Sequence, residues 1–161
     1  MFLILEMPNM RKTLVALLAL FLVPGVFAQG GTVQTATVTL TSAQLQHLHA
    51  SPVQLVATPG AGQFVDIISA AYQYKVGSTP YSTDAGGSFV IWPSAIYPIA
   101  ATGFIDQTSN TVAVAGKSTE TVYQTVVENT AIMLRNDSAT EWSGGDGTVT
   151  ITVSYRVVAL Q

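Results

Sequence analysis

The stretch Thr148–Val157, TVTITVSYRV, decides the fold class. Valine, isoleucine and tyrosine occupy every second position from Val149 onward, and threonine, serine and arginine fill the positions between them. Successive side chains of a strand point to opposite faces, so this alternation predicts a strand with one buried and one wet face. We therefore expect a sheet that packs one of its sides on an apolar core.

Seven further segments have the β-branched and aromatic composition of strands. They are Thr35–Leu40, Val53–Thr58, Phe64–Val76, Ser88–Trp92, Ile96–Phe104, Thr119–Glu128 and Ala131–Asn136. Turn-forming residues separate them, and the Gly-rich segment Pro59–Gly62 predicts a hairpin turn. One short helical turn is expected within Thr41–His49, capped by Thr41 or Ser42, because Leu45 and Leu48 are spaced to face inward together.

About eight short strands without a strand–helix–strand rhythm predict an all-β fold. We expect an antiparallel β-sandwich of jelly-roll type with two four-stranded sheets, and an up-and-down barrel is the alternative. Residues 37–161 are assigned to the sandwich domain, and residues 29–36 to a flexible N-terminal arm.

Residues 10–28, MRKTLVALLALFLVPGVFA, have the layout of a secretory signal peptide. Arg11 and Lys12 precede the apolar run Leu14–Val23, and a cut after Ala28 has small residues at the required positions. We therefore expect residues 1–28 to be removed, and the rest to be exported to the periplasm or the medium without a membrane anchor.

Charged residues are 9% of the chain against a typical ~25%, and the net charge is −3. The basic side chains after residue 28 are Lys75, Lys117, Arg135 and Arg156, which are too few to form a patch that neutralises phosphates. Nucleic acid is therefore not expected as a partner. Because cysteine is absent, stability has to come from the core or from oligomerisation.

Side chains that could carry chemistry are sparse. His47 and His49 have neither a third histidine nor a cysteine to complete a zinc site, and no serine lies in a nucleophile motif. The acidic residues of the predicted turns are first of all turn formers, and calcium binding among them stays open. They are Asp84, Asp106, Asp137, Glu141 and Asp146. We expect no catalytic residues, no cofactor, no metal ligands and no enzymatic activity.

Three aromatic residues are candidates for ligand or interface contacts, namely Trp92, Tyr97 and Trp142. Exposed rings could stack on sugars, although core packing is the simpler explanation for a tryptophan. This leaves open an exported adhesin or carbohydrate-binding module that recognises a surface glycan.

The segment Phe64–Val76 carries apolar residues on both faces of a regular strand. Phe64, Ile68, Tyr72, Tyr74 and Val76 would lie on one face, and Val65, Ile67 and Ala71 on the other. A sandwich strand needs one apolar face, so the second is expected to be covered by a neighbouring subunit. The sequence therefore predicts a homo-oligomer.

Several motifs in the first half of the chain together resemble the opening of small virion structural proteins of tailed bacteriophages. They are Thr39–Leu45 (TLTSAQL), Leu48, Ser51–Val56 (SPVQLV) and Pro59–Gly62 (PGAG). Ile67–Ala70 and Tyr74–Tyr81 are similar to the next block of that family, and Gly144–Val158 resembles its closing strand. The resemblance spans most of residues 37–158. It implies a decoration or fibre-like β-sandwich that packs as a homo-oligomer, with a trimer expected, against capsid or tail proteins. It also implies a virion-associated location and no enzymatic activity.

Overall fold

Two long antiparallel strands, β3 (Gln63–Lys75) and β10 (Thr148–Ala159), form the middle of the first sheet. Its edges are β1 (Gln34–Leu40) and β7 (Thr111–Gly116), which gives the order β1-β10-β3-β7. The second sheet has the order β2-β8-β5-β6. Its strands are β2 (Val53–Val56), β8 (Ile132–Asn136), β5 (Ser88–Trp92) and β6 (Ile96–Ala100). A small third sheet pairs β4 (Tyr81–Ser82) with β9 (Ser143–Gly144). The computed structural model describes residues 31–83, 87–93, 96–116 and 127–161.

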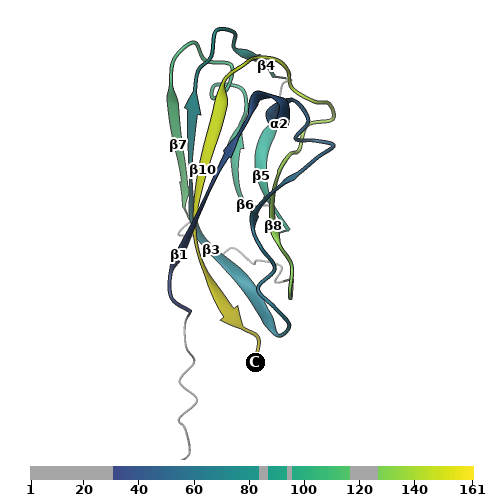
Figure 1. The fold of residues 1–161 in the computed structure, drawn as a ribbon, viewed down its shortest axis with the longest axis vertical. Coiled ribbons are helices and arrows are strands. Elements are labelled where there is room, and N and C mark those ends of the chain that lie inside the picture. Colours follow the sequence, from purple (N-terminus) through teal and green to yellow (C-terminus); the bar gives the residue numbers. More distant parts are fainter. Residues whose placement is uncertain (1–30, 84–86, 94–95, 117–126) are drawn as a thin grey trace, which may run out of the picture.

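The pairing of the eight strands in the two large sheets follows a rolled-up hairpin. The first strand pairs with the last, and the pairs continue inward as β2 with β8, β3 with β7, and β5 with β6. All these pairs are antiparallel, and the two sheets lie face to face (Figure 1). This is the jelly-roll arrangement. The predicted all-β sandwich is therefore confirmed, including its two four-stranded sheets.

Strand β10 keeps the predicted alternation as far as Val153, and residues 154–158 beyond it are all half-buried. Val149, Ile151 and Val153 are fully buried, and Thr150 and Thr152 between them are half-buried on the opposite face. The periodicity of this strand therefore decides which of its own residues join the core.

Strand β3 departs from a regular strand at one residue, and this corrects the expectation of two apolar faces. Ser154 pairs with Ser69 but Tyr155 pairs with Ile67, so Ile68 is an extra residue in the ladder. A bulge of this kind changes which alternate positions face inward. The buried residue Ile67 therefore lies on the same side as Tyr72 and Tyr74. Most of the apolar residues of β3 face the sandwich core without a neighbouring subunit.

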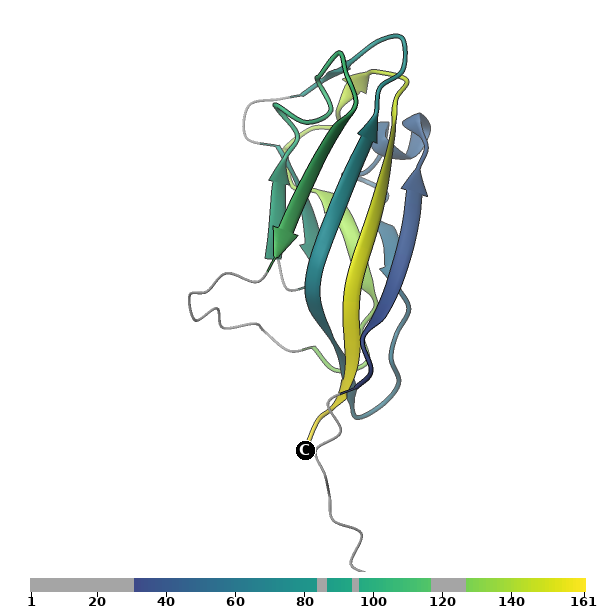
Figure 2. The same cartoon turned by 90° about the vertical axis from the view of Figure 1, so that its left-hand side faces the viewer.

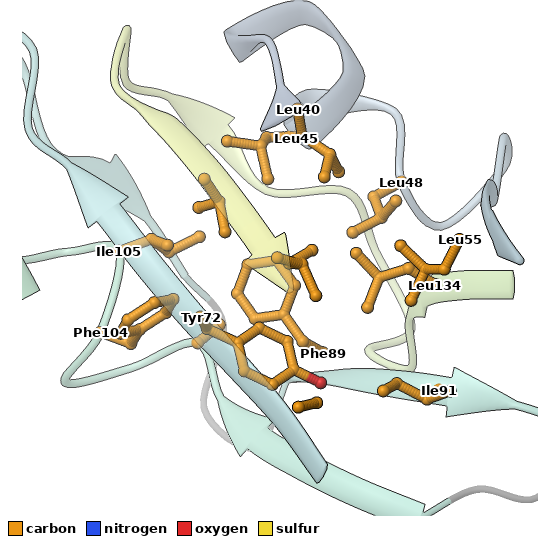
Figure 3. Close-up of a cluster of buried hydrophobic side chains, with 14 of the residues drawn as sticks. Leu40, Leu45, Leu48, Leu55, Tyr72, Phe89, Ile91, Phe104, Ile105 and Leu134 are labelled. Carbon is orange, nitrogen blue, oxygen red and sulfur yellow. The ribbon is translucent and has the colours of Figure 1, made fainter. Parts of the chain in front are cut away.

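The core between the sheets is rich in aromatic rings (Figure 3). Phe89 of β5 lies with its ring centroid 4.5 Å from that of Trp142, 5.9 Å from Phe104 and 6.0 Å from Tyr72 of β3. Tilted and edge-on ring pairs of this kind stabilise a core beyond the apolar area they bury. Phe89 therefore links the second sheet to the first.

The predicted helical turn forms α2 (Ser42–Gln46) and covers one end of the core. Thr41 is its N-cap, and the side chains of Thr41 and Gln44 each accept a hydrogen bond from the other residue's backbone N–H. This reciprocal capping box satisfies two N–H groups that a helix start leaves unpaired. Leu45 and Leu48 are both fully buried, as their spacing predicts.

Several predicted boundaries are wrong. The predicted strand Ile96–Phe104 ends at Ala100, because residues 101–105 form a turn in which Phe104 and Ile105 donate to the Ala101 carbonyl. The segment Pro59–Gly62 is not a hairpin turn, since it joins β2 of one sheet to β3 of the other. Strand β1 begins at Gln34, inside the predicted N-terminal arm. The predicted strand Thr119–Glu128 stays a prediction, because most of it lies outside the described residues.

Candidate interaction surfaces

The outer face of the first sheet carries mostly small uncharged side chains. Figure 2 shows the four strands of this sheet, β7, β3, β10 and β1, side by side. Antiparallel partners project from the same side of a sheet, so the register places three rows of four residues on this face. The rows are Thr35, Ser154, Ser69 and Gly116; Thr37, Thr152, Ala71 and Val114; and Thr39, Thr150, Gln73 and Val112. We call these twelve positions the uncharged face. They include no acidic or basic residue.

The two sides of the uncharged face differ in polarity. On the β1 side, Thr37 and Thr152 share a hydrogen bond between their hydroxyls (3.2 Å), and so do Thr39 and Thr150 (2.9 Å). On the β7 side, Val112 is 65% exposed and Val114 is 70% exposed. These are the two most exposed large hydrophobic residues in the part of the chain that the structure describes. The β7 side is therefore where burial by a partner would gain most.

The outer face of the second sheet is different in composition. Trp92 is 41% exposed at the end of β5, opposite the half-buried Met133 of β8. Arg135 is exposed two residues further along β8, opposite Val90. Val90 is buried without belonging to the core cluster. Tryptophan, methionine and arginine are the residues most enriched at interfaces, so this group is a second candidate surface.

The three aromatic candidates have different fates. Trp92 is exposed and stays available to a ligand. Tyr97 belongs to β6, but its side chain is outside what the structure describes. Trp142 is 1% exposed and packs on Phe89 in the core, so it is not a surface contact. Trp142 stands beside the glycine-rich turn 144–147, and this setting in the sequence does not reveal whether the ring is buried in the core or exposed on the surface.

Every acidic residue in the described ranges accepts a hydrogen bond, mostly from a backbone N–H of another loop. The pairs are Asp66 with Arg156, Asp106 with Gly103, Glu128 with Gly62, Asp137 with Ser88, Glu141 with His49 and Ala50, and Asp146 with Ser78 and Thr79. Within these ranges no three His, Asp or Glu side chains cluster as metal ligands would. Asp84 lies outside them. Most of these carboxylates thus connect two loops by hydrogen bonds.

Asp146 is the clearest example, because it connects the loop before β10 to the loop after β3. The Ser78 hydroxyl donates to its Oδ2 (2.6 Å) and the Thr79 backbone N–H donates to its Oδ1 (2.9 Å). These hydrogen bonds, that of the Ser78 side chain first, lower the pKa of the Asp146 carboxyl from 3.8 to about 2. The adjacent Gly77 leaves room for the carboxylate, because a Cβ there would overlap Oδ1. The charge of Asp146 therefore holds two loops together.

The histidines are exposed and structural. His47 is the C-cap of α2, and its backbone carbonyl accepts from the Ser51 N–H. The His49 backbone N–H donates to Glu141.

No helix among the described residues is long and apolar enough to cross a membrane. No known family model matches this chain, and no curated protein sequence matches it. Among solved structures, the capsid asymmetric unit of the cyanophage Pam1 contains a similar chain. The TM-score is 0.45 at 18% identity, and the match covers 80% of this chain and 86% of that chain. The similarity is remote, so the function has to be inferred from this chain's own residues.

Proposed function

We propose that this chain is a non-enzymatic structural protein that works by packing with copies of itself, as decoration proteins of phage virions do. The uncharged face carries the proposal. Threonine, valine and alanine side chains have few rotamers to lose, so burying them against a partner costs little conformational entropy. The absence of charge on the face removes the repulsion that usually keeps identical surfaces apart.

Two further observations support a structural role. In the described ranges, the carboxylates that a hydrolase or a calcium site would need already accept hydrogen bonds, most of them from neighbouring turns. The motifs around α2 and β2 resemble those of small virion structural proteins of tailed bacteriophages. Under this proposal the partners are the chain itself, as the trimer that the resemblance implies, and the capsid or tail proteins of a virion.

Light scattering after size exclusion at micromolar concentration tests the proposal. We expect the mass of several chains in a closed assembly. A control variant, Gln54→Glu, adds a charge at an exposed position of β2 in the second sheet and should leave the mass unchanged. If the unmodified protein has the mass of one chain throughout the concentration range, the assembly proposal is wrong.

A second candidate function is an exported binding module for a surface glycan. The exposed ring of Trp92 favours it, because sugar rings stack on exposed aromatic faces. Glycan-array binding that is lost in Trp92→Ala but kept in Val114→Glu, the variant expected to block assembly, would favour this function over assembly. Export itself is proposed from residues 10–28 and is tested by N-terminal sequencing of secreted protein, which should begin at Gln29.

A further inference from the structure

We infer that β7 is a pairing edge, at which the β7 strand of a second copy of this chain adds antiparallel to the first sheet. The inference rests on the proposed self-assembly and names the strand that performs it. The second copy would extend the sheet across a two-fold axis, so that the two uncharged faces become one continuous surface.

The first argument is that the residues of β7 itself have none of the sequence features that protect a sheet edge. Folded proteins block exposed edges with lysine, proline, a bulge or a very short strand. Strand β7, with the sequence TVAVAG, is six residues long and has no charge, no proline and no shift in its pairing with β3. Alternate residues of an antiparallel strand bond to opposite sides, so about half of its backbone groups point away from β3. In the described part of the chain, β3 is the one strand that pairs with β7.

The second argument is the exposed valines. In an antiparallel pair of β7 strands centred on Ala113, Val112 of each copy lies opposite Val114 of the other. Cross-strand pairs of β-branched side chains stabilise a sheet. Both valines are at least 65% exposed in the single chain, so pairing removes apolar surface from water. The other edge, β1, displays threonines whose hydroxyls already have partners, and it would gain less.

The third argument is electrostatic self-complementarity. A two-fold axis brings identical residues together, so a charged residue near the axis would meet its own copy. The residues of β3 next to β7 on this face are Ser69, Ala71 and Gln73, and all are uncharged. Lys75 lies at one end of the face, and the Arg156–Asp66 ion pair lies toward the other end of β3. A second copy is therefore the partner that this edge fits without repulsion.

The test compares Val114→Glu with Val114→Thr in purified protein, using light scattering and sedimentation, and circular dichroism to verify folding. The side chain is mostly exposed, so both variants should fold. We expect an even number of chains in the unmodified protein: two, or six if trimers also form through another surface. Val114→Glu should raise the dissociation constant of the pairing step about a hundredfold or more, because each carboxylate would lie against Val112 of the other copy and diagonally across from the second carboxylate. Val114→Thr and the second-sheet control Gln54→Glu should behave like the unmodified protein.

Proline substitutions test the backbone contribution. The N–H groups of neighbouring residues point to opposite edges, so Ala113→Pro and Val114→Pro remove one bond to β3 and one free donor. The variant that loses the bond to β3 should have a lowered melting temperature. The variant that loses the N–H group pointing away from β3 should keep its melting temperature and fail to associate.

The outcomes separate the two proposals. A single-chain mass for the unmodified protein would overturn the proposed self-assembly. An assembly that persists in folded Val114→Glu, or one with an odd number of chains, would overturn β7 pairing and leave self-assembly intact. If Val114→Glu does not fold, Val112→Glu provides the same comparison at the other exposed valine.

Discussion

The two sheets of the sandwich differ most at their edges. In the second sheet, β6 contains Pro98 and β2 is four residues long with a shift in register, so both edges are poor templates for another strand. In the first sheet, neither β1 nor β7 contains a charge, a proline or a register shift in its pairing. In a chain with 9% charged residues, edges are protected by backbone irregularity rather than by lysine. Among the described strands, those at the edges of the first sheet lack these irregularities.

The outer faces of the two sheets also differ, in the residues that they display. The second sheet displays Trp92 and Arg135, which are suited to one specific contact. The first displays rows of threonine, serine, alanine and valine, which are suited to repeated packing. Both sheets share one aromatic core, so the difference between them belongs to the surface.

The largest predicted effect tests that shared core. Phe89→Ala should lower the free energy of unfolding by about 3–5 kcal/mol, because it leaves a cavity among the rings of Tyr72, Phe104 and Trp142. Trp92→Ala, three residues along the same strand but exposed, should cost about 1 kcal/mol or less. Urea denaturation followed by circular dichroism measures both. Similar costs would mean that the inner and outer faces of β5 are assigned wrongly.

A smaller effect is expected for the first sheet, where β10 can be tested at adjacent residues. Ile151→Ala should cost about 2–5 kcal/mol, since the side chain is fully buried. Thr152→Ala should cost under ~0.5 kcal/mol, because its hydroxyl bonds to Thr37 on the accessible face. The same denaturation experiment applies. A costly Thr152→Ala would show that the uncharged face is already buried, as it would be in an assembly that does not dissociate on dilution.

The sequence was a good guide where one periodicity ran without interruption. The alternation of β10 and the leucine spacing of α2 predicted which side chains are buried, because each depends on local geometry alone. Strand β7 was not predicted. Its larger residues, Val112 and Val114, face outward while Ala113 and Ala115 pack on the core, which reverses the usual size pattern of a surface strand.

The bulge and the edges could not be predicted from the sequence for a different reason. Ile68 becomes an extra residue through its pairing with β10, which is far away in sequence. Whether a strand lies at an edge likewise depends on long-range pairing. The uncharged face depends on the bulge and on which strands lie at the sheet edges. The sequence alone therefore identified Trp92 but missed this face.

The smallest predicted effect concerns the loops that lead out of β3 and into β10, where Asp146 joins the two. Its carboxyl has a pKa of about 2 in the folded chain against 3.8 as a free side chain, so the folded state favours the charged form. The contribution of Asp146 to stability is therefore complete above about pH 4 and is lost as the pH falls through about 2. Asp146→Asn should remove this part of the acid sensitivity and slightly lower the melting temperature at neutral pH.

Ser78→Ala provides the matched control for Asp146, since it removes the strongest donor and keeps the charge. In this variant the pKa of the Asp146 carboxyl, followed by NMR titration of its side-chain carbon, should rise from about 2 toward 3.8. An unchanged pKa in Ser78→Ala would assign the shift to backbone N–H donors, that of Thr79 first. Because the side chain is exposed, salt should weaken the effect, whereas the core substitutions in both sheets should be insensitive to salt. Salt dependence therefore separates the charge-held loops from the sheets, which depend on packing.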